Sequence, residues 1–115
     1  MDAQSEHRAE ALRAFVSRHP DGWHHGDWER LVGELRGRGL LPDGQEDLLG
    51  KELERERVRQ ILESLEVPGL GPKRREAVAE AFGHVWKLRN ASVEDVVSLP
   101  TISRRIAADL VAALR

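Results

Sequence analysis

The stretch from Val67 to Val78 constrains the fold of this chain more than any other. Gly69 and Gly71 stand one residue apart, and glycine reaches backbone angles that a side chain would forbid, so the chain can reverse direction sharply here. Pro72 suits the first position of a new helix, where its missing N–H is no loss. We therefore expect a tight turn between two helices.

Three cations, Lys73, Arg74 and Arg75, directly follow this turn. Their placement is unfavourable in an isolated helix, because the N-terminus of a helix already carries roughly half of a positive elementary charge. An anion that docks on the free backbone N–H groups beside these cations would remove the conflict. The stretch thus indicates a phosphate-binding turn. The alternative is a structural helix–helix turn whose cations are solvated or paired with neighbouring Glu.

The rest of the chain predicts an all-α fold. Apolar residues recur at helical spacing, and no convincing strand pattern of period two is present. Asp27, Ser92 and Ser103 are the expected N-caps, and Val85, Trp86 and Leu88 form an apolar connector expected to be buried. The expected helices lie at about residues 6–18, 27–38, 45–65, 72–82, 92–99 and 103–114.

A longer pattern surrounds the glycine turn. Its first part, Val67-Pro68-Gly69-Leu70-Gly71, reads hydrophobic-Pro-Gly-hydrophobic-Gly, and the pattern continues through Phe82-Gly83, Asn90–Asp95 and Leu99–Ser103. Residues 67–114 thereby resemble a tandem helix-hairpin-helix domain, similar to the C-terminal domain of the C component of the bacterial excision nuclease. Related domains occur in Holliday-junction helicases, NAD-dependent DNA ligases and XPF/ERCC-type nucleases. The resemblance implies sequence-independent binding to the phosphate backbone of DNA across a minor groove.

The resemblance also implies how the chain is divided. Residues 1–55 would form an N-terminal three-helix lobe of unknown role, and residues 56–115 the tandem helix-hairpin-helix domain, with the third helix shared. Charge follows a similar division: residues 1–66 carry a net charge of −5 and residues 67–115 a net charge of +3. Nucleic acid would prefer the basic part. We expect the acidic lobe to be a support or a docking surface for a protein partner, because a recognition helix normally carries cations.

In the first hairpin, the backbone amides and the cations that follow them are the expected DNA contacts. The residues that we expect to bind DNA there are Gly69, Leu70, Gly71, Lys73, Arg74 and Arg75.

The second hairpin departs from the family pattern. Thr101-Ile102-Ser103 stands where Gly-hydrophobic-Gly is usual, and a β-branched residue tolerates a positive φ poorly. We therefore expect a different turn or a less close approach to phosphate, with hydroxyl groups as donors in place of amides. A hairpin kept only to complete the fold is the alternative. The residues expected to bind DNA there are Thr101, Ser103, Arg104 and Arg105.

Catalytic and metal sites are not evident in the sequence. The Glu54–Arg57 run lacks the Lys and Asp of the XPF-type nuclease signature and fits a solvated helix face. His24 and His25 have no third ligand at a suitable spacing, and the chain has no Cys. We expect no enzyme activity and no cofactor. The resemblance leaves one ion open, because hairpin carbonyls in this family sometimes hold a monovalent cation, here at the first hairpin.

The leading interpretation is a non-enzymatic DNA-binding protein, accessory to an enzyme of DNA repair or recombination. No apolar run approaches the roughly 20 residues that cross a bilayer, so we expect a cytoplasmic protein without membrane contact. The alternative is a protein–protein interaction or dimerisation module that has lost most DNA binding. That alternative predicts a large exposed apolar area around the 85–88 connector and the last helix.

Overall fold

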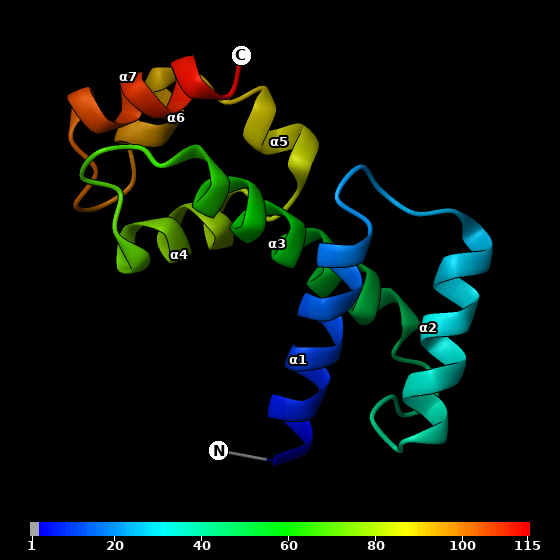
Figure 1. Cartoon of the computed structure of the whole chain (residues 1–115). Helices are drawn as coiled ribbons and strands as arrows, with labels where there is room; N and C mark the ends of the chain where they lie inside the picture. Colours follow the sequence, from blue (N-terminus) through cyan, green and yellow to red (C-terminus); the bar gives the residue numbers. More distant parts are fainter. Residues whose placement is uncertain (1–2) are drawn as a thin grey trace. The chain divides into compact units, whose positions relative to one another are not determined.

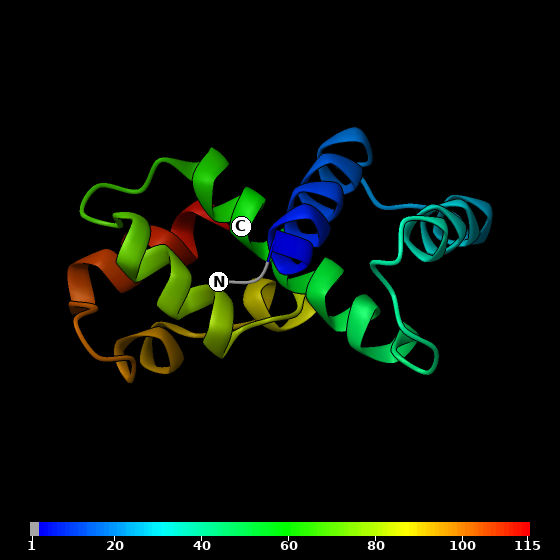
Figure 2. The same cartoon turned by 90° about the horizontal axis from the view of Figure 1, so that it is seen from below.

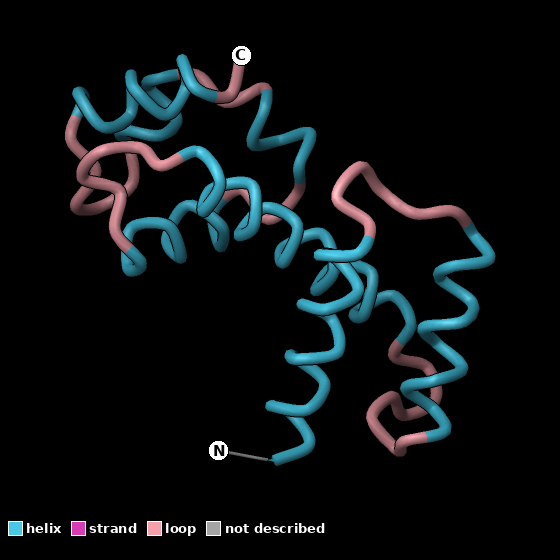
Figure 3. The backbone as a smooth tube through the Cα atoms, viewed as in Figure 1, coloured by secondary structure: helices cyan, strands magenta, loops and turns pink. Residues whose placement is uncertain are grey.

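The computed structural model describes residues 3–115, shown in Figure 1. Over these residues the chain forms seven α-helices and no strand, with loops between them as drawn in Figure 3. The predicted all-α fold is confirmed. The helices are α1 (Ala3–Arg18), α2 (His25–Gly37), α3 (Glu46–Leu65), α4 (Pro72–Ala81), α5 (Val85–Arg89), α6 (Val93–Val97) and α7 (Arg104–Ala113).

The chain divides into two compact units, Met1–Leu53 and Glu54–Arg115, each with its own hydrophobic core. Helix α3 contributes to both cores, through Leu49 and Leu53 in the first and through Val58 and Leu62 in the second. The predicted role of the N-terminal lobe, as a support or docking surface, stays a prediction.

In the N-terminal unit, α1 and α2 pack their apolar faces on the start of α3. Trp23 and Trp28 lie partly buried against this core. The prediction that Asp27 caps α2 is wrong, because the helix begins at His25 and Asp27 lies in its first turn. The Asp27 carboxylate instead accepts a hydrogen bond from the backbone N–H of His24 at 3.1 Å, and this bond is the main reason that the pKa of Asp27 is lowered.

The C-terminal unit contains two helix–turn–helix hairpins. The first joins α3 to α4 and the second joins α6 to α7, while α5 connects the pair. Figures 1 and 2 both show the two hairpin turns at one end of this unit and α5 at the other. Val78, Leu88, Val96 and Leu110 are fully buried between these helices. Packing therefore presents both turns on the same side.

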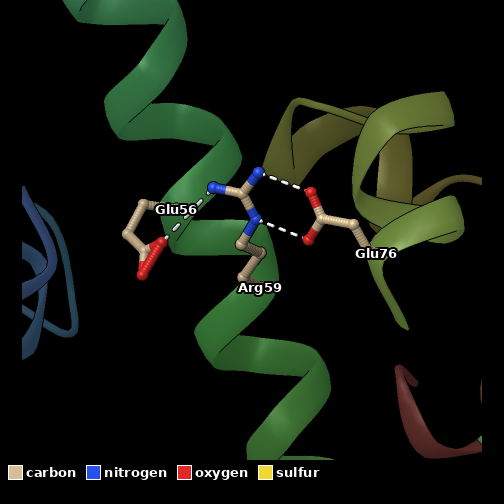
Figure 4. Close-up of polar contacts among 3 residues, drawn as sticks. All are labelled: Glu56, Arg59 and Glu76. Atoms are coloured by element: carbon tan, nitrogen blue, oxygen red, sulfur yellow. Dashed lines mark hydrogen bonds and ion pairs between the residues drawn. The ribbon is translucent and has the colours of Figure 1, made fainter. Parts of the chain in front are cut away.

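A bidentate ion pair holds the middle of α4 against α3 (Figure 4). Arg59 donates to the two carboxylate oxygens of Glu76, from Nε at 2.8 Å and from Nη2 at 2.6 Å, and its Nη1 lies 3.5 Å from Glu56. The hydrogen bonds from Arg59 hold the pKa of Glu76 below its ordinary value. Paired N–H donors to one carboxylate fix orientation as well as distance, so this contact helps to orient α4 on α3.

The connector is buried less completely than expected. Val85 and Leu88 are buried, but Trp86 is 68% exposed, so the prediction that Trp86 belongs to the core is wrong. Three residues of α7, Ala107, Leu110 and Val111, are also buried within this unit. Among residues 3–115 the exposed large hydrophobic side chains are Leu48 and Trp86.

Candidate nucleic-acid interface

The two hairpin turns share the conformation of their central residue but begin differently, since Glu66 has a φ of 51° where the equivalent Ser98 has a φ of −63°. Gly69 and Thr101 hold equivalent places, with φ values of 83° and 68°, and both lie in the left-handed region. In each turn an N–H closes on a carbonyl, from Leu70 to Val67 at 3.1 Å and from Ile102 to Leu99 at 3.4 Å. The central part of the second turn thus matches the first, contrary to expectation, and a less close approach to phosphate stays a prediction. Thr101 adopts the conformation that its β-branched side chain disfavours.

Each turn ends at the start of a ten-residue helix. Gly71 is the N-cap of α4 and has no side chain to cap it, whereas the Ser103 hydroxyl caps α7 by accepting a hydrogen bond from Ile106 N at 3.2 Å. The acceptor side of the Ser103 hydroxyl is thus occupied, while its hydrogen remains able to bind an anion. The cap predicted at Ser103 is confirmed.

Backbone N–H groups without an internal acceptor line the two turns. Within the described part of the chain, the amides of Gly69, Gly71, Thr101 and Ser103 donate no hydrogen bond. Gly71 has an ordinary φ of −76°, and nothing lies within 4 Å of a Cβ built on it. Neither the turn nor the packing of this chain therefore requires glycine at position 71, although close approach of a ligand to the backbone would.

The cations beside the turns are placed in three different ways. Lys73 and Arg105 take the same position in α4 and α7, and both are exposed. Arg75 is half-buried. Arg104 is exposed but forms an ion pair with Glu94 at 3.0 Å, and its hydrogen bond is the main reason that the pKa of Glu94 is lowered.

Arg74 has a role that the sequence did not reveal. Its Nη1 donates to the carbonyl of Gly69 at 2.9 Å, and its Nε donates to the carbonyl of Thr101 at 2.8 Å. The guanidinium therefore connects the two turns. A monovalent cation at the first hairpin stays a prediction, and the Gly69 carbonyl there already faces the positive charge of Arg74.

Leu70 supports the turn with both its side chain and its backbone. The side chain is 4% exposed and belongs to the core of the C-terminal unit, and the N–H closes the turn on Val67. Contact with DNA stays a prediction for this residue and for the other expected site residues. Metal binding by side chains has no candidate in residues 3–115, where no cluster of three or more His, Asp or Glu could hold an ion.

The fold and the paired turns define a class of protein, and comparison with known families agrees with it. Residues 56–115 match the family described as the SAM-like helix-hairpin-helix tandem, and the chain belongs to this family. The predicted tandem helix-hairpin-helix domain is confirmed.

Several curated relatives are UvrABC system protein C from different bacteria. The chain is 44% identical over 55 residues to that of Carboxydothermus hydrogenoformans, covering 47% of this chain and 9% of the relative. It is 41% identical over 70 residues to that of Photorhabdus laumondii, covering 59% and 11%, and 45% identical over 49 residues to that of Beutenbergia cavernae, covering 43% and 7%. The chain thus spans about a tenth of the length of these relatives.

No solved structure matches the chain. None of the helices described in residues 3–115 is both long enough and apolar enough to cross a membrane.

Proposed function

We propose that this chain binds DNA without sequence specificity, by holding backbone phosphates at its two hairpins. The observation that carries this proposal is the pair of equivalent turns on one side of the C-terminal unit, each with unused N–H groups at the start of a helix. Such amides bind phosphate oxygens, and nearby cations strengthen the attraction. Membership of the helix-hairpin-helix tandem family supports the same class of function.

The exposed cations are arranged to complete both phosphate sites. Lys73 and Arg105 are the second residues of α4 and α7, so each hairpin offers amides and an exposed positive charge at an equivalent place. Amide–phosphate contacts fix position on a duplex but carry no base information. We therefore expect similar affinity for duplexes of unrelated sequence.

The similarity to UvrABC system protein C supports a setting in DNA repair, in which this chain would be an accessory and not the enzyme. The acidic N-terminal unit would then serve as the contact for a protein partner. A dimerisation module is the weaker candidate, because the large apolar residues of α5 and α7 are buried or partly buried within the unit, with Trp86 as the exception.

The test is a fluorescence-anisotropy titration of the chain with duplex, single-stranded and forked DNA over a range of salt concentrations. Each lost phosphate contact should lower the slope of log affinity against log salt by about 0.9. We expect this loss for Lys73→Ala and for Arg105→Ala. Lys87→Ala is the matched control, because Lys87 is an exposed cation on α5, away from the turns.

A second variant separates backbone approach from charge. Gly71→Ala adds a methyl group in open space at an ordinary φ, so stability should hold within about 0.5 kcal/mol. Its affinity for duplex DNA should nevertheless fall, because the methyl group keeps phosphate away from the amides. Equal loss of affinity in Lys73→Ala and Lys87→Ala, or absence of binding by the unaltered chain at low salt, would overturn the proposal.

A further inference from the structure

Two reciprocal contacts hold the hairpins together, each made by a residue of one hairpin with the turn of the other. Arg74 and Ile106 are both the third residue of the helix that follows their turn. Arg74 reaches across to the carbonyl of Thr101 in the other hairpin, and Ile106 packs across against Gly69. A Cβ built on Gly69 would lie 3.1 Å from Cδ1 of Ile106, which shows how closely the second contact fits.

The guanidinium of Arg74 is suited to this crossing contact. It donates from two different nitrogens, to its own turn at 2.9 Å and to the other turn at 2.8 Å. Both acceptors are carbonyls of residues with positive φ, so the contact is made where each turn departs from ordinary backbone. The planar fork of an arginine can hold two acceptors in a fixed relation, whereas a lysine acts as a single point charge.

We propose that Arg74 is a positioning residue, which holds the two turns at the spacing needed to bind one duplex together and does not itself contact phosphate. This inference rests on the proposed function. Arg74 is half-buried and already donates to two carbonyls, unlike the exposed Lys73 and Arg105. On this proposal Arg74 fixes the backbone of the turns, while Lys73 and Arg105 contact the phosphates.

The consequence is that the hairpins bind DNA as a linked pair. Linked sites gain affinity because the second contact forms at a high effective concentration, and the gain is lost when geometry prevents both from engaging. Loss of the crossing contact should therefore remove the contribution of the second hairpin while leaving its residues in place. A direct phosphate contact predicts something different, since any cation at position 74 would then serve.

The experiment is a double-mutant cycle between Arg74→Lys and Arg105→Ala, read by affinity for duplex DNA. Arg74→Lys keeps the charge but cannot donate to both carbonyls as a fork. We expect it to weaken binding about tenfold, which is part of the roughly 100-fold or greater gain available to linked sites. In that background Arg105→Ala should have almost no further effect, although it weakens the unaltered protein.

A second readout does not depend on DNA. Hydrogen exchange at the Ile102 amide, which closes the second turn on Leu99, should accelerate in Arg74→Lys while the core amides of α3 remain protected. Such a local change shows that the variant is folded. Arg74→Met, which lacks the charge, should behave like Arg74→Lys in this measurement.

The outcomes separate this inference from the function on which it rests. Near-normal affinity of Arg74→Lys, with an undiminished effect of Arg105→Ala in that background, would overturn the positioning role while leaving phosphate binding intact. Failure of the unaltered chain to bind DNA would overturn the proposed function and the positioning role together. Unchanged exchange at Ile102 in both Arg74 variants would also overturn the positioning role.

Discussion

Replacing Thr101 with glycine should stabilise the C-terminal unit. Thr101 has a φ of 68°, a conformation that costs an L-residue roughly 1–2 kcal/mol and glycine almost nothing. The exposed Thr101 side chain makes no hydrogen bond within residues 3–115, so its removal should sacrifice little. The Thr101 carbonyl, which accepts from Arg74 at 2.8 Å, is kept in the variant.

The size of the effect follows from two opposing terms. Relief of the backbone conformation favours the variant by about 1–2 kcal/mol, and the greater freedom of glycine in the unfolded chain opposes it by about 0.5–1 kcal/mol. The net gain should be about 0.5–1 kcal/mol, which for a unit of this size raises the melting temperature by roughly 2–8 °C.

The assay must follow the C-terminal unit specifically. Trp23 and Trp28 belong to the N-terminal unit and Trp86 is already exposed, so tryptophan fluorescence would report mainly on the wrong unit. Hydrogen exchange of the α4 and α7 amides gives the required measure, because both helices lie in the C-terminal unit. Thr101→Ala is the control, which removes the β-branch but keeps Cβ, and should fall between the two. A glycine variant that is less stable than the unaltered protein would refute the reasoning.

Three further perturbations test the fold. Arg59 holds the pKa of Glu76 below its ordinary value of 4.5, so the stabilisation is complete above that pH and is lost as the pH falls through the lowered pKa. In Glu76→Gln the free energy of unfolding, measured by urea denaturation, should depend less steeply on acid pH, by less than about 1 kcal/mol. An equally steep curve would contradict the assignment. Gly69→Ala places a Cβ 3.1 Å from a side chain at a φ of 83° and should lower the free energy of unfolding by about 1–3 kcal/mol in chemical denaturation, whereas an unchanged value would contradict this reasoning. Ser92→Ala removes half of a capping box and should cost about 1 kcal/mol in thermal unfolding, whereas an unchanged melting temperature would show that the cap is dispensable.

Local signals in the sequence predicted the elements that depend on local chemistry. Ser92 and Asp95 form the expected reciprocal cap of α6, with N–H to oxygen distances of 2.9 and 3.1 Å. Gly69 takes the positive φ that the turn requires, and Pro72 begins α4. Each of these features is decided within a few neighbouring residues, so the sequence pattern was sufficient.

Two features were not predicted from the sequence: the side of α5 that Trp86 occupies, and a contact between residues far apart in the sequence. Val85 and Leu88 lie three residues apart and share a face of α5, whereas Trp86 lies about 100° around the helix from Val85 and faces solvent. Grouping all three as an apolar connector ignored this rotation. Arg74 was placed correctly at a helix start, but its partner Thr101 is in the other hairpin, and nothing local indicates that contact.

The two hairpins therefore share the conformation of the central turn residue and differ in the side chains that they present. The first turn has Gly69 and Gly71, neither of which adds a side chain of its own beside the amides of the turn. The second has Thr101 and Ser103 at those places and a further cation, Arg104, at the start of its helix. Amide contacts need close approach, whereas hydroxyl and guanidinium groups reach outward. Under the proposed function, the second hairpin would therefore offer phosphate a different kind of donor from a turn whose central conformation is the same.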